Sequence, residues 1–133
     1  MSEECTEYVD HRTFLRRLLV KKAINVHVSR HAVKRLKERA TRDYLKCDKR
    51  VLLDVIRNIV RDGRYKASTS RLLIWTKRYV LISEILDENT ILVKTVISKL
   101  VLREELRNIL TGGYRAEWKK INVTIHSHQA ERM

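Results

Sequence analysis

One histidine and two arginines recur at intervals of four residues in the segment 29–40, SRHAVKRLKERA. On an α-helix, steps of four turn by only about 40° each, so His31, Arg35 and Arg39 share a strip about 80° wide. Guanidinium groups hold phosphate through paired hydrogen bonds, and imidazole titrates near neutral pH. The spacing therefore predicts a phosphate-binding strip with an acid or base beside it. A separate apolar strip lies about 120° away and would dock the helix on a core. It consists of Val33, Leu36 and Ala40.

Three roles for this strip are open. In the first, His31 moves protons during RNA cleavage and the two arginines stabilise the developing charge. In the second, the same side chains only hold a backbone phosphate. In the third, His31 packs near a sheet, while the arginines pair with acids such as Glu38 or Glu84.

The net charge indicates the class of partner. Lys and Arg number 29 against 16 Asp and Glu, which gives a formal charge of +13 and a pI near 10.1. Such self-repulsion usually persists because the partner is a polyanion, so nucleic acid is favoured. The alternatives are a charge that only keeps the protein dispersed, or an anionic membrane surface. The chain lacks a run of about 20 apolar residues and a signal-peptide pattern, so we expect a cytoplasmic protein that does not enter a membrane.

The hydrophobic patterns predict one α+β domain over 1–133. Antiparallel strands form a β meander, and helices pack on one of its faces. The segment 66–70 is expected to be a loop, and 121–125 is either an edge strand or mobile. The expected helices are 6–20, 29–40, 48–63 and 99–110, and the expected strands are 24–28, 72–76, 79–86 and 90–97.

A second group of candidate residues lies on an expected strand. Arg71, Trp75 and Lys77 alternate on one face, and such a basic and aromatic face suits stacking on an unpaired base. The alternative is that Trp75 belongs to the core and the cations form a rim around it. Lys34 and Arg78 are further cations expected to contact nucleic acid. We expect no metal site and no cofactor, because the cysteines and the histidines in the tail lack a ligand pattern. These are Cys5, Cys47, His126 and His128.

The segment 29–39 matches the motif Ser-x-His-Ala-x-x-Arg-x-x-x-Arg, and the helix 54–63 and meander 71–97 follow it in order. In these features the chain resembles a family of small uncharacterised domains related to the RelE/ParE/BrnT-type toxins. The resemblance covers about 22–98 and implies a RelE-like fold, with the N-terminal helix and the part after 99 as additions. It also implies an RNA target, an antitoxin-like protein partner and catalytic cations on the sheet, for which Arg71 and Lys77 are the candidates.

These observations lead to one expected function and two alternatives. We expect a basic, toxin-like protein that binds RNA in preference to DNA. Cleavage of the RNA stays open; it would be metal-independent, with His31, Arg35 and Arg39 as the catalytic group. The first alternative is a non-catalytic DNA-binding or architectural protein. The second is a homodimeric interaction protein whose N-terminal or 99–110 helix buries its apolar face against another copy.

Overall fold

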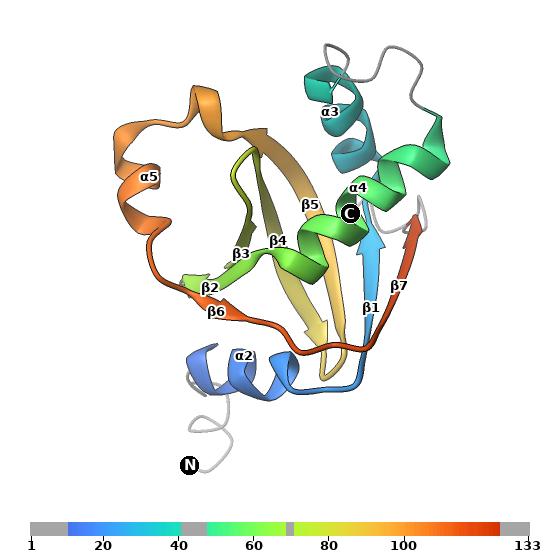
Figure 1. Ribbon diagram of the computed structural model, residues 1–133, viewed down its shortest axis with the longest axis vertical. Coiled ribbons are helices and arrows are strands. Elements are labelled where there is room, and N and C mark those ends of the chain that lie inside the picture. The colour runs from blue at the N-terminus through green and yellow to red at the C-terminus, as the bar shows by residue number, and fades with distance from the viewer. Residues whose placement is uncertain (1–10, 41–47, 69–70, 126–133) are drawn as a thin grey trace, which may run out of the picture.

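The computed structural model describes residues 11–40, 48–68 and 71–125, and these form an α+β structure around one curled sheet (Figure 1). The sheet has seven strands in the order β6-β2-β3-β4-β5-β1-β7. The strands are β1 (Ala23–Val28), β2 (Arg64–Ser68), β3 (Arg71–Trp75), β4 (Tyr79–Asp87), β5 (Thr90–Ser98), β6 (Tyr114–Arg115) and β7 (Lys120–Ile125). The helices are α2 (His11–Leu19), α3 (Arg30–Ala40), α4 (Lys49–Asp62), the 3-10 helix η1 (Lys99–Val101) and α5 (Glu104–Ile109).

The predicted meander is confirmed, and it has one strand more than expected. Strands β2 to β5 pair in succession and are all antiparallel. The segment 66–70 was expected to be a loop, which is wrong for its first residues, because β2 extends to Ser68. Tyr65 alternates with polar neighbours and is fully buried, so β2 is a strand held by tertiary packing more than by its composition.

The sheet is mixed and not purely antiparallel. Strand β1 lies between β5 and β7 and is parallel to both. The chain returns from β1 to its neighbour β5 only after α3, α4 and the meander, which is the long connection that a parallel pair requires. Of the two alternatives for the segment 121–125, an edge strand or a mobile segment, the structure shows the edge strand, β7.

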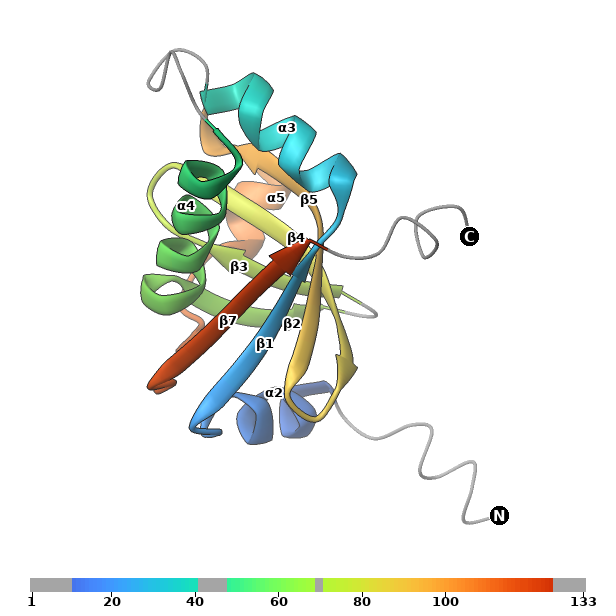
Figure 2. The same cartoon turned by 90° about the vertical axis from the view of Figure 1, so that its right-hand side faces the viewer.

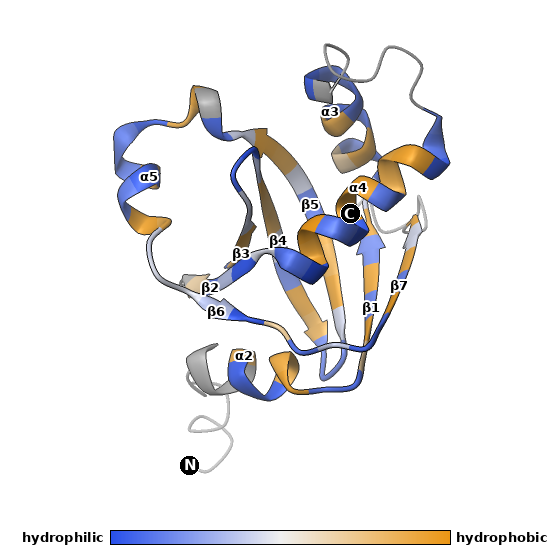
Figure 3. Ribbon diagram, in the orientation of Figure 1, coloured by the Kyte–Doolittle hydropathy of each residue, from blue (hydrophilic) through white to orange (hydrophobic). Residues whose placement is uncertain are grey.

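The main core lies on the face of the sheet covered by α2, α3 and α4. Alternate residues of the strands point into it, as Ile24, Val26 and Val28 of β1 do. The helices contribute the residues at helical spacing, including Leu36 of α3 and Ile56 of α4. Figure 3 shows these apolar stretches in orange on the strands and on the inner sides of the helices.

A second, smaller core lies on the opposite face, so helices cover both faces and not one as expected. Leu73, Trp75 and Val80 point away from the main core and pack against Leu102 and Leu110. The expected helix 99–110 is also divided. Arg103 has an extended backbone, with φ −68° and ψ 151°, and it separates η1 from α5.

The two helices expected to pair with another copy direct part of their apolar residues inward. On α2, Leu15, Leu18 and Leu19 belong to the main core. Beyond Ser98, Leu102 and Leu110 belong to the smaller core. The homodimer stays a prediction; the buried leucines of α2 do not support it, whereas Ile109 of α5 is 37% exposed.

A candidate nucleic-acid interface on helix α3

Ser29 fixes the start of α3 against the sheet. Its Oγ accepts a hydrogen bond from the backbone N–H of Ala32 at 3.0 Å and so caps the helix. The same Oγ donates to the carbonyl of Lys94 at 3.0 Å, and the Ser29 N–H donates to the carbonyl of Val93 at 3.0 Å. One residue therefore joins β1, β5 and α3. Any function of α3 rests on this rigid attachment.

The predicted strip on α3 is present as a physical contact between its first two members. The Nε of Arg35 donates to the Nε2 of His31 at 3.4 Å. The Nη1 of Arg35 also pairs with Glu38 at 3.1 Å. His31 is exposed and does not pack near the sheet. The third role predicted for the strip is therefore only partly present. Arg35 pairs with Glu38 as expected, but His31 is not packed near the sheet.

Arg39, the last member of the strip, carries a buried donor without an acceptor. Its Nε is inaccessible to solvent and has no hydrogen-bond partner among the described residues. A buried N–H left unpaired costs about 1–3 kcal/mol, so such a group is rare in a finished structure. Because solvent does not reach this Nε, an external ligand would contact the half-buried Arg39 only through the rest of its guanidinium.

The remaining outer positions of α3 are also basic. Arg30, Lys34 and Lys37 are exposed, and with Arg35 and Arg39 they give five cations against one acid, Glu38, on an 11-residue helix. We call these five cations the α3 cationic surface. This surface is larger than the predicted strip. Of the nucleic-acid-binding residues predicted outside the strip, it includes only Lys34.

Two of the four cations of the neighbouring helix α4 are held by acids of the same helix. Arg57 pairs with Asp54 at 2.9 Å and Arg61 pairs with Asp62 at 3.0 Å. The hydrogen bond from Arg61 lowers the pKa of Asp62 below its usual value, so this carboxyl stays ionised near neutral pH. Arg57 and Arg61 are thus neutralised locally, as Arg35 is on α3.

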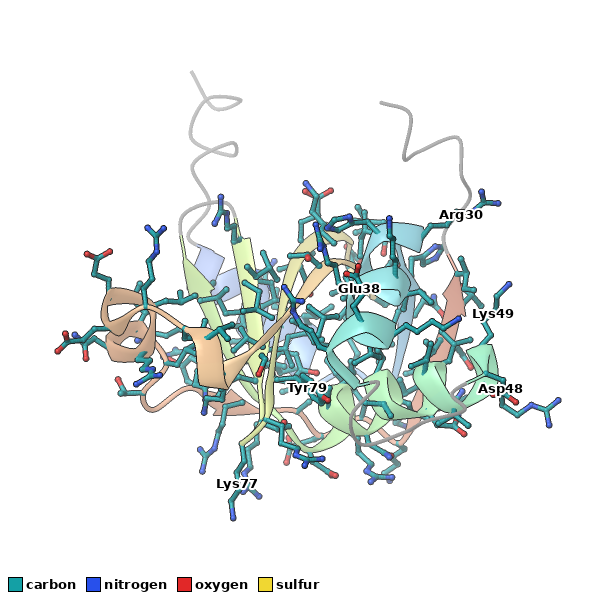
Figure 4. The ribbon with its side chains drawn as sticks, turned by 90° about the horizontal axis from the view of Figure 1, so that it is seen from above. Arg30, Glu38, Asp48, Lys49, Lys77 and Tyr79 are labelled. Carbon is teal, nitrogen blue, oxygen red and sulfur yellow. The ribbon has the colours of Figure 1, made fainter. Side chains whose placement is uncertain are left out.

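The strand residues predicted for the interface do not join α3. Trp75 is 6% exposed and packs in the smaller core, so its indole offers no stacking surface for a base. Arg71 and Lys77 are exposed, but they lie at the start of β3 and in the turn after its end, and β4 and β5 separate β3 from β1. Figure 4 shows Lys77 pointing away from α3. Arg78 lines a pocket against α4, together with Asn58 and Asp62.

Glu84 has an ion-pair role, as one interpretation of the sequence expected, but with a different partner. Its carboxylate lies 3.7 Å from the Nζ of Lys94 on β5 and not beside the arginines of α3. Both side chains are about half exposed, so the pair contributes little to stability.

Sequence reasoning missed a hollow beside the start of α3. It is lined by Arg30 and Val33 of α3, Lys49 at the start of α4, and Ile125 at the end of β7. Figure 4 shows Arg30 and Lys49 on the same side of the molecule. The only signal in the sequence is that each cation directly follows a helix cap, Ser29 or Asp48.

The part of the chain that the structure describes contains neither a cluster of metal-ligating side chains nor a helix that could cross a membrane. No group of three or more metal-ligating side chains is found over 11–40, 48–68 and 71–125. His126, His128, Cys5 and Cys47 lie outside these residues. Within the same ranges, every helix is too short or too polar to cross a membrane.

Comparison of the chain with models of protein families, with curated proteins and with solved structures gave no match.

Proposed function

We propose that this protein binds nucleic acid through the α3 cationic surface. The observation that carries the proposal is the set of five cations on one short helix. Phosphate oxygens accept hydrogen bonds from guanidinium and ammonium groups, and a phosphate brings a charge that offsets the repulsion among the five cations. The net charge of +13 would draw any polyanion toward the protein before contact.

The dimensions of α3 suit a nucleic-acid backbone. Eleven residues span about 16 Å, which corresponds to about five phosphates along one strand of a duplex. The helix is anchored by Ser29 to β1 and β5, so little ordering is needed before binding. A rigid cationic rod loses less conformational entropy on binding than a flexible tail would.

The proposal includes RNA as the target and a RelE-like core. Its support is the Ser-x-His-Ala-x-x-Arg-x-x-x-Arg motif on α3, together with the order of elements: β1, α3, α4 and then the meander. The RNA target and the RelE-like core rest on the resemblance. The α3 cationic surface supports only the proposal that the protein binds nucleic acid. Binding to DNA without cleavage is the alternative that the test below separates.

A second candidate function is metal-independent RNA cleavage, favoured by the contact between His31 and Arg35. The Nε2 of His31 accepts from Arg35, so this nitrogen holds a lone pair at the surface. In the proposed step, Arg35 first leaves Nε2, the lone pair so exposed takes the proton from a ribose 2′-OH, and the 2′ oxygen attacks the adjacent phosphorus. The bond from phosphorus to the 5′ oxygen breaks, and that oxygen leaves after protonation by water. Arg35, released from both Nε2 and Glu38, would contact the phosphate and stabilise the developing charge.

The binding proposal is tested by titrating fluorescently labelled single- and double-stranded RNA and DNA of equal length at stepped salt concentrations. We expect affinity to fall linearly on a log–log plot, with a slope that corresponds to about three to five phosphate contacts. Tighter binding to RNA than to matched DNA supports the RNA target. Equal or tighter binding to DNA favours the architectural alternative, and absence of binding at low salt contradicts the proposal.

A further inference from the structure

Strand β7 is a long and regular edge of the sheet. All six of its residues pair with β1 without a register shift. No described strand lies on its outer side (Figure 2). The opposite edge, β6, has only two residues. The two edges therefore differ greatly in how much backbone they offer to another strand.

The outward backbone groups of β7 can be identified. The N–H of Lys120 donates to the carbonyl of Lys22 at 3.1 Å, so residue 120 faces β1. Because successive residues of a strand direct their backbone groups to opposite sides, Asn122 and Thr124 also face β1. Ile121, Val123 and Ile125 then direct three N–H and three C=O groups away from the sheet.

The usual defences of an edge strand are missing from β7. Natural edges are protected by proline, bulges or charged side chains. Strand β7 has no proline, no bulge with β1, and one charged residue, Lys120, at its first position. Its side chains are half-buried on the face toward the main core and exposed on the other face. Such an edge is suited to pairing with another strand.

We propose that β7 pairs antiparallel with β7 of a second copy of this chain, around a two-fold axis at Val123. The argument for a second copy is that the segment Ile-Asn-Val-Thr-Ile has the same apolar and polar pattern in both directions. In this register Val123 faces its own counterpart, and Ile121 faces Ile125. These are the residues with outward backbone groups, so the three opposing pairs form six hydrogen bonds.

The same register matches the side chains on both faces. The half-buried apolar side chains meet one another on the face that α4 covers. On the other face Asn122 of each copy lies opposite Thr124 of the second copy, so polar groups meet polar groups. Lys120 lies outside the five residues, 121–125, that pair with the second copy. The charge of +13 on each copy still opposes association, so salt should strengthen the dimer.

The first test uses analytical ultracentrifugation without nucleic acid, so that its outcome is independent of the proposed function. At about 0.5 M salt we expect a species of twice the chain mass of 15.8 kDa. Val123→Pro removes the central outward N–H and should give a monomer. Val123→Ala is the matched control, because it removes the side chain, keeps the N–H and should still dimerise. Thermal melting of both variants checks that each is folded.

The second test examines the register. In the variant carrying both Asn122→Lys and Thr124→Lys, like charges face each other twice, so the dimer should dissociate. In the variant carrying Asn122→Asp and Thr124→Lys, opposite charges face each other twice, so the dimer should persist. A wild-type monomer at millimolar concentration would overturn the proposal. Equal association of the folded Val123→Pro and Val123→Ala variants, or of the two charge variants, would also overturn it.

Discussion

The Nε of Arg35 lies 3.4 Å from the Nε2 of His31, one turn earlier on α3. The same guanidinium pairs with Glu38 through Nη1 at 3.1 Å. One arginine therefore connects the imidazole with the carboxylate of this helix. The side chains of Arg35 and Glu38 are 42% and 45% exposed, so water already weakens their pairing. Breaking the pair between Arg35 and Glu38, so that a phosphate can take the place of the carboxylate, therefore costs little free energy.

This competition predicts that Glu38→Gln strengthens binding to nucleic acid. The substitution frees Arg35 and removes a negative charge that repels phosphate, so we expect affinity to rise about two- to fivefold at low salt. The control is Asp54→Asn, which removes the same charge beside Arg57 on α4 and should change affinity less. Fluorescence anisotropy measures both. Weaker binding by the Glu38→Gln variant would contradict this role for Arg35.

The unpaired Nε of Arg39 predicts a separation of stability from binding. Arg39→Met keeps the apolar stem and removes the buried donor, so the free energy of unfolding should stay equal or rise by about 1 kcal/mol. Binding should weaken about three- to tenfold, because one phosphate contact is lost. Urea unfolding and anisotropy on the same preparation give both values. A large loss of stability with unchanged affinity would show that Arg39 serves the fold.

The cleavage account makes a prediction for His31→Ala. Removing a proton-transfer group should lower the rate of RNA cleavage at least about 100-fold and leave affinity within a fewfold, because the group acts in the transition state. Arg35→Ala should weaken both binding and cleavage. The assay is single-turnover cleavage of a mixed-sequence RNA in the presence of EDTA. Wild-type protein that leaves this RNA intact would refute metal-independent cleavage and leave binding as the function.

Much of the frame around α3 could be predicted from the sequence because its signals are local. The helices expected at 29–40 and 48–63 are present as α3 and α4, and Ser29 and Asp48 cap them. The contact between His31 and Arg35 also follows from helical geometry alone. Such features depend on residues within a few positions of one another.

The features that could not be predicted depend on distant partners. The pairing of β1 with both β5 and β7 depends on strand order, which alternation does not specify. Trp75 is buried because α5 packs on the outer face of β3, and nothing near Trp75 in the sequence indicates this. The separation of Arg71 and Lys77 from α3 also depends on strand order, because β4 and β5 lie between β3 and β1. A strand shows which residues share a face but not how far that face lies from a given helix.

A pH prediction follows from Tyr65, whose hydroxyl donates to the carbonyl of Val60 inside the main core. Burial raises the pKa of Tyr65 well above its ordinary value of 10.0. Below about pH 10 both states keep the proton, and the free energy of unfolding does not depend on this group. Above pH 10 the unfolded chain releases the proton and the folded protein keeps it, so stability falls as pH rises.

Tyr65→Phe is the variant that isolates this effect. It should lower the free energy of unfolding by about 1 kcal/mol at pH 8, through the lost hydrogen bond. The difference from wild type should then narrow between about pH 10 and 11.5, because the variant lacks the ionising phenol. Urea unfolding at pH 8, 10 and 11 checks this. A difference that widens with pH would contradict the assigned direction of the pKa shift.

The most direct test of the interface compares two variants of equal charge loss on opposite sides of the molecule. One carries Lys34→Ala and Lys37→Ala on the outer side of α3. The other carries Arg103→Ala and Arg107→Ala at α5, far from α3 in Figure 1. All four side chains are exposed, so both variants should fold. Salt-dependent binding to a labelled single-stranded RNA should lose about two phosphate contacts from its slope in the α3 variant and at most a small fraction in the α5 variant. Equal losses would show that net charge alone binds the RNA and would contradict a specific interface on α3.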